Sequence, residues 1–186
     1  MKTNKVRPLA ENERLFGKKN GLIKKKRPNI YKMMADKYFQ LLKWLYELND
    51  KDIEKGLKEG LDKFLSNLYL SRYKNKCAAC EYITQKALSS YKKKNGVRFH
   101  FEHIVPKTEY IQRKCEELAR QGKLQVKYIE TLLRKYFHCA YVTEEEDKRL
   151  LKDKMPTDWN GKDIFARYKK AGIKLIENPF YGEKGD

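Results

Sequence analysis

The chain has 186 residues, 40% of them hydrophobic, which supports one compact unit or two closely packed ones and leaves no window of about 18 apolar residues for a membrane span. Its 43 Lys and Arg residues outnumber its 25 Asp and Glu residues, so the formal net charge is +18. This surplus favours nucleic acid as the partner, because Lys and Arg neutralise phosphates, although a ribosome-associated or merely soluble basic protein can carry the same charge.

A basic arm is predicted for residues 1–30, which lack a sustained apolar period. Its second lysine-rich run, made of Lys24, Lys25, Lys26 and Arg27, is expected to contact the phosphates of a nucleic acid. We therefore interpret the arm as a phosphate-tracking segment that is ordered only in part.

A helical hairpin is predicted for residues 31–74. Apolar residues recur at helical spacing over 31–48, and Asn49-Asp50 ends this helix and caps a second one that is expected to reach about Tyr73. Such a pair can recognise DNA, form a dimer or buttress the rest of the chain. A buttress is the commonest of these roles for apolar helical stripes.

Residues 75–186 are predicted to mix helices with two strands, so we expect an α+β fold that is mostly helical. Thr143 and Glu146 have the T-x-x-E spacing of a capping box, which predicts a helix start. The expected elements in chain order are a turn at 74–80, a short helix through Ala87, a strand at 97–105 ended by Pro106, helices at 109–121 and 126–137, a strand at 139–142, a helix from Thr143 through Leu151, a helix at 163–171 that stops at Gly172, and an irregular tail.

An acid and an imidazole stand side by side near the end of the first predicted strand, at Glu102 and His103. Cleavage of a phosphodiester requires a deprotonated water, and a neutral imidazole can take that proton near pH 7. A hard cation such as Mg²⁺ prefers a few carboxylates together with water and phosphate oxygens. A regular strand would send the two side chains to opposite faces, so a shared site requires a bend or strand end, which Pro106 favours.

The order strand, loop, strand, helix resembles the ββα-metal finger of the HNH endonucleases. The sequence Glu-His-Ile-Val-Pro at 102–106 is similar to the family's Asp-His or Glu-His element at the end of its first strand. His138 stands where the family has its central Asn, and Asp147, four residues after Thr143, stands where the family has its final His, Asn or Asp.

This resemblance implies a role for each matched residue. His103 would be the general base, His138 a second catalytic residue in the place of the Asn, and Glu102 and Asp147 the ligands of Mg²⁺ or another divalent cation. Three further cations near this finger are expected to contact nucleic acid in addition to the arm, namely Lys107, Lys148 and Arg149. For Lys148 and Arg149, a position on a solvated helix face without a ligand is the more common interpretation.

The four cysteines lack the spacing of a disulfide framework, which favours a reducing, cytoplasmic location. Cys77 and Cys80 stand where many HNH proteins carry the first half of a structural zinc site. Cys115, Cys139 or His100 could complete the four zinc ligands, but none of them supplies a second pair that is close in sequence. Buried or free thiols are therefore favoured over structural zinc.

The sequence as a whole predicts an endonuclease of the HNH type that hydrolyses phosphodiester bonds in double-stranded DNA with a divalent cation. Restriction, phage and homing enzymes are all compatible with it, and a homodimer is possible. The alternative is a non-catalytic basic protein that binds DNA or RNA and keeps the finger as a scaffold. The histidine at the family's Asn position keeps this alternative open.

Overall fold

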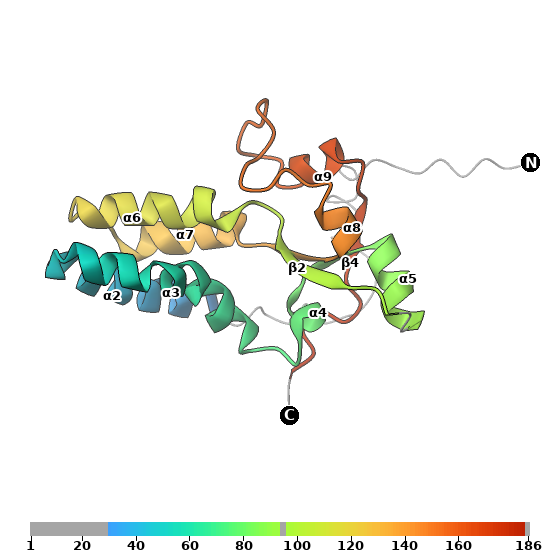
Figure 1. The fold of residues 1–186 in the computed structure, drawn as a ribbon, viewed down its shortest axis with the longest axis horizontal. Helices are drawn as coiled ribbons and strands as arrows, with labels where there is room; N and C mark the ends of the chain where they lie inside the picture. The colour runs from blue at the N-terminus through green and yellow to red at the C-terminus, as the bar shows by residue number, and fades with distance from the viewer. Residues whose placement is uncertain (1–29, 94–95, 185–186) are drawn as a thin grey trace, which may run out of the picture.

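A computed structural model describes residues 30–93 and 96–184, so the predicted basic arm, apart from Ile30, lies outside the described residues. In these two ranges the fold is mixed α+β, with long helices at one end and a small sheet at the other (Figure 1). None of the helices described here combines the length and apolar character that a membrane crossing requires.

The predicted helical hairpin is present as α2 (Ile30–Leu48) and α3 (Lys51–Leu70). Asp50 caps α3, because its carboxylate accepts hydrogen bonds from the backbone N–H groups of Asp52 and Ile53. The second helix ends at Leu70, a few residues before the predicted Tyr73. The apolar stripe of α2 is buried as far as Leu45, as its spacing predicts, whereas Leu48 at its end is exposed.

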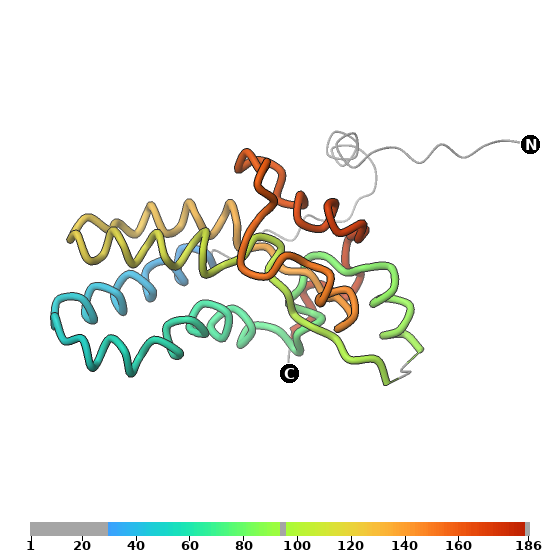
Figure 2. The backbone as a smooth tube through the Cα atoms, turned by 45° about the horizontal axis from the view of Figure 1, so that its top comes forward, coloured from blue at the N-terminus to red at the C-terminus, as the bar shows by residue number. Residues whose placement is uncertain are grey.

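A second helical pair packs against α2 and completes this half of the molecule (Figures 1 and 2). It consists of a π-helical turn η1 (Thr108–Gln112), α6 (Arg113–Arg120) and α7 (Val126–Tyr136). The helices predicted at 109–121 and 126–137 are thereby confirmed, although the π-helical opening was not foreseen. The two pairs bury a shared core that includes Tyr38, Leu65 and Leu133.

The sheet has four strands in the order β2-β3-β1-β4. β2 (Phe99–His103) and β3 (Cys139–Thr143), both predicted, pair antiparallel, with Phe99 opposite Thr143 and His103 opposite Cys139. β1 (Tyr82–Thr84) runs parallel to β3, and β4 (Leu175–Glu177) runs antiparallel to β1. β1 and β4 correct the prediction, which placed a helix and an irregular tail at these two segments.

Four shorter helices surround the sheet: α4 (Lys76–Ala79), α5 (Gln85–Lys93), α8 (Glu144–Asp147) and α9 (Ala166–Lys170). The capping box of Thr143 and Glu146 is present at the start of α8. α9 is shorter than the helix predicted at 163–171, and it is followed by Gly172 in the left-handed region at φ +66°.

The prediction of a long helix after Thr143 is wrong, because α8 has only four residues. The backbone carbonyls of Leu151 and Lys152 instead accept hydrogen bonds from Arg167, at 2.7 and 2.9 Å. The side chain of Leu150 is buried in a small core together with Ile104. These contacts with distant parts of the chain replace the helical turns that local spacing predicts.

Candidate functional site

Strand β2 and helix α8 place three polar side chains near one another: Glu102 and Asp147, which were predicted, and His100, which was not. His100 and Glu102 are two positions apart on the regular strand, and their side chains therefore lie on the same face of it. The Nδ1 atom of His100 lies 3.3 Å from an Oδ atom of Asp147 on α8. The capping box holds α8 directly at the end of β3, which fixes Asp147 above this face.

Glu102 is paired with a buried arginine from a distant part of the chain. Arg167, only 2% exposed, donates hydrogen bonds from Nη2 to Oε1 of Glu102 and to the backbone carbonyl of His103. Burial raises the pKa of the Glu102 carboxyl, while the Arg167 guanidinium opposes this rise and the nearby Asp147 adds to it. Arg167 thus ties the end of β2 to the segment after α8.

A hollow of about 400 Å³ opens beside these groups. Its wall includes the carboxylates of Glu102, Asp147 and Asp153, part of His103, and several cationic side chains. The cations on the wall are Lys107, Lys148, Lys152 and Arg167. A phosphate group entering the hollow would therefore meet positive charge beside two carboxylates that could share a metal ion.

The ring of His103 points to the other face of β2. Its Nε2 atom lies 3.0 Å from the hydroxyl of Ser66 on α3, and its Nδ1 atom lies 3.6 Å from the Sγ atom of Cys139. The ring of Phe137 packs edge-on against it, with 4.8 Å between ring centroids. Burial, together with Lys107 and Arg167, lowers the pKa of His103 to about 3, so its imidazole is neutral.

His138 lies just before β3 and forms a pair with Glu81. Its Nδ1 atom lies 2.5 Å from an Oε atom of Glu81, and both side chains are largely buried. The backbone carbonyl of His138 accepts a hydrogen bond from the N–H of Ile104 at 2.8 Å, which extends the β2–β3 pairing by one step. His138 therefore braces the chain behind the hollow, and its ring does not join His100 and the two carboxylates.

The three predicted cations near the finger have different environments. The ammonium group of Lys107 donates hydrogen bonds to the Asp62 carbonyl and to Gln112, and burial lowers its pKa. Arg149 donates to the Ala171 carbonyl at 2.6 Å. Lys148, directly after α8, is exposed and pairs with Glu144 at 2.8 Å. Of the three, Lys148 is the one most open to a ligand.

The other four predicted contact residues belong to the arm outside the described ranges: Lys24, Lys25, Lys26 and Arg27.

A magnesium ion is compatible with the donors at this site. Within residues 30–93 and 96–184, no three His, Cys, Asp or Glu side chains gather closely enough to form a complete protein cage for a metal. Magnesium usually needs only one or two carboxylates, because water and substrate phosphates complete its shell. Glu102 and Asp147 fit that requirement, with one oxygen of Glu102 shared with Arg167.

The cysteines form a separate buried environment. All four are free thiols with buried side chains. Burial raises the pKa values of Cys80 and Cys139 well above the usual range, which favours the protonated thiol over the thiolate that binds metals. The interior around Cys77 is occupied by Asn178, whose amide donates to the carbonyls of Cys77 and Cys80 at 2.7 and 2.8 Å.

Two residues of the site were missed from the sequence. His100 could have been found, because it stands two positions before Glu102 on a predicted strand and must share its face. Arg167 is 65 positions from Glu102, and no local pattern links it to the strand. Comparison with known proteins gives no further guide, since no family model, curated protein or solved structure matches this chain.

Proposed function

We propose that this protein is a nuclease that hydrolyses phosphodiester bonds in double-stranded DNA with a divalent cation, and that β2, β3 and α8 act as a finger of the HNH type. One observation carries the proposal. Two carboxylates, Glu102 and Asp147, line a hollow whose wall also carries four cationic side chains, and the imidazole of His100 lies 3.3 Å from Asp147. The formal charge of +18 supports a polyanionic substrate.

In this proposal Glu102 and Asp147 would hold Mg²⁺ or another divalent cation, which would neutralise the charge that develops on the leaving oxygen. His100 is the general base that the geometry favours. Its side chain is 45% exposed, and Asp147 can orient it through Nδ1 and leave Nε2 to take the proton of an attacking water. The sequence pattern gives this role to His103, whose two ring nitrogens face Ser66 and Cys139.

The cations of the hollow would position the scissile phosphate. Lys148 and Lys152 are both exposed at its edge, so their ammonium groups can reach a bound backbone without breaking internal contacts of the fold, apart from the Lys148 pair with Glu144. Such contacts hold a substrate without reading its bases. In this proposal the site therefore recognises the DNA backbone. Any preference for a DNA sequence would come from other parts of the protein surface.

The proposal is tested by relaxation of a supercoiled plasmid with Mg²⁺ and with EDTA. The parent protein should nick the plasmid only with the cation. Asp147→Asn should lower the rate, because an amide is a weaker ligand for a hard cation, whereas the matched control Glu145→Gln should cut normally. Glu145 also lies on α8, but it is exposed and pairs with Lys86. No cleavage with any divalent cation, or equal rates for the two variants, would contradict the proposal.

A second candidate is a basic DNA- or RNA-binding protein without catalysis. It is favoured by one observation, the engagement of Glu102 by the buried Arg167, which occupies an oxygen that a metal ion would use. Binding of DNA with the same salt dependence in the parent and in Asp147→Asn, without cleavage by either, would support this candidate.

A further inference from the structure

The outer side of the helical hairpin carries an exposed apolar patch next to the turn between α2 and α3. We call this patch the hairpin tip and define it as Trp44, Leu48 and Ile53, whose exposed fractions are 49%, 45% and 38%. Trp44 and Leu48 lie one helical turn apart on α2, and Ile53 is in the first turn of α3. Large apolar side chains gathered at one exposed place are typical of an interaction surface.

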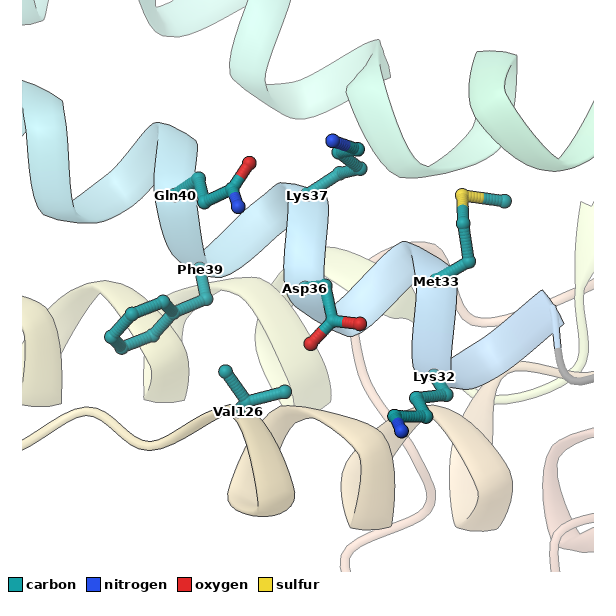
Figure 3. A pocket seen from close by; sticks show the side chains of 7 residues that line it. All are labelled: Lys32, Met33, Asp36, Lys37, Phe39, Gln40 and Val126. Carbon is teal, nitrogen blue, oxygen red and sulfur yellow. The ribbon is translucent and has the colours of Figure 1, made fainter.

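A hollow lies along the same helix and ends one helical turn before Trp44. It measures about 550 Å³ and is lined mainly by α2 residues, together with Val126 of α7. In Figure 3, Phe39 lies on the same side of α2 as Val126, and Met33 projects from the opposite, α3-facing side. Gln40, at the end of the hollow, is one turn before Trp44. The lining also includes Lys32, Asp36 and Lys37, so the helix presents an aromatic side chain next to a hollow of mixed apolar and charged character.

Charge restricts what can bind here. Residues 30–70 contain seven lysines and seven acidic residues, so the hairpin is neutral, and the surplus of +18 resides in the rest of the chain. A nucleic acid is attracted to clustered positive charge and gains little from a neutral surface. Two copies of a strongly basic chain repel each other over most of their surfaces, but they can meet at a neutral one.

From these features we infer that the hairpin tip and the adjoining hollow form an interface with a second copy of this chain. A twofold axis across two antiparallel α2 helices would put Trp44 of each copy against the hollow of the other, which is the self-complementary pattern of isologous dimers. Trp44 would serve as the rigid aromatic anchor.

This interface is remote from the candidate nuclease site. Figures 1 and 2 both show the turn between α2 and α3 at the end of the molecule farthest from the sheet. Dimerisation there would leave the hollow beside β2 and α8 of each copy open. The dimer would exist whether or not the protein cleaves DNA, so the two proposals can fail separately.

Sedimentation velocity of the full chain over roughly 1 to 100 µM, at moderate salt, tests the interface. The parent should show a reversible species of twice the 22.3 kDa monomer mass. Trp44→Ser and Gln40→Arg should each weaken the dimer by roughly tenfold or more, since the first removes the aromatic side chain and the second fills and charges the hollow. Tyr128→Ser is the matched control, because Tyr128 is also an exposed aromatic, 37% accessible, but lies on α7. It should leave the dimer unchanged.

Circular dichroism of each variant establishes that it is folded, which is expected for substitutions at exposed positions. A second readout is the tryptophan fluorescence of the parent, in which the contribution of Trp44, beside that of Trp159, should shift to longer wavelength on dilution as the indole becomes hydrated. A parent that stays monomeric at the highest concentration would overturn the inference, as would dimers that are insensitive to Trp44→Ser and Gln40→Arg. Loss of DNA binding in Trp44→Ser with the dimer intact would identify the tip as a nucleic-acid surface and would also overturn it.

Discussion

Replacement of Arg167 by Met should destabilise the fold strongly, because this buried guanidinium joins three segments. It donates hydrogen bonds to the Glu102 carboxylate and to the carbonyls of His103, Leu151 and Lys152. Breaking a buried ion pair by removing one partner costs about 3–5 kcal/mol. The Glu102 side chain is 27% exposed and can be partly hydrated, so we expect a loss toward the lower limit, about 3 kcal/mol.

The assay is urea unfolding followed by circular dichroism, with thermal unfolding as a second measure. A loss of about 3 kcal/mol corresponds to a fall in Tm of roughly 6–12 °C for a chain of this size. Arg149→Met is the matched control, since Arg149 is exposed and donates to a single carbonyl. It should cost less than about 1 kcal/mol. A loss below about 1 kcal/mol for Arg167→Met would refute the reasoning.

The pH dependence of the Arg167→Met variant provides a sign test. Arg167 lowers the pKa of Glu102 against the rise that burial causes, so the variant should have a still higher Glu102 pKa. A carboxyl whose pKa is higher in the folded than in the unfolded state binds its proton more tightly when folded. The variant should therefore regain stability as the pH falls through that pKa. A parallel pH profile in the parent and the variant would contradict the pairing.

Three other changes test separate parts of the structure. Glu146→Ala should cost about 1–3 kcal/mol in urea unfolding, because Oε2 of this buried side chain accepts three hydrogen bonds from two threonines, whereas the exposed Glu145→Ala should cost little. Lys148→Ala and Lys152→Ala should each reduce the salt dependence of DNA binding by roughly one unit of log-log slope, measured by fluorescence anisotropy; an unchanged slope would exclude phosphate contacts. Removal of residues 1–28 should lower affinity at moderate salt and leave the cleavage pattern unchanged, and a changed pattern would mean that the arm reads bases.

The long elements of this fold could be predicted because their sequence patterns are local. The stripe of α2 repeats over several turns, and Asp50 provides a cap for α3 within three residues. β1 and β4 could not be predicted in the same way, since each has three residues. Their strand conformation depends on pairing between Ile83 and Ile176, which are far apart in the chain.

The candidate site was predictable where it depends on strand geometry and the capping box. The predicted shared site of Glu102 and His103 required a bend or strand end near Pro106, but the strand is regular as far as His103, so alternation sends the two side chains to opposite faces. The same rule identifies His100 as the histidine that shares the Glu102 face. The partner of Glu102 could not be predicted, because Arg167 reaches it only through the tertiary fold.

The measurement that tests the central claim most directly is the single-turnover cleavage rate of a labelled DNA duplex, with and without Mg²⁺, for the parent, His100→Ala and His103→Ala. The parent should cleave only with the cation. His100→Ala should be slower by about 10² to 10⁴, the usual contribution of a general base. His103→Ala should retain most of the rate at a temperature where it remains folded, because its ring faces Ser66 and Cys139. Absence of cleavage by the parent would contradict the nuclease proposal, and a loss confined to His103→Ala would contradict the role of His100.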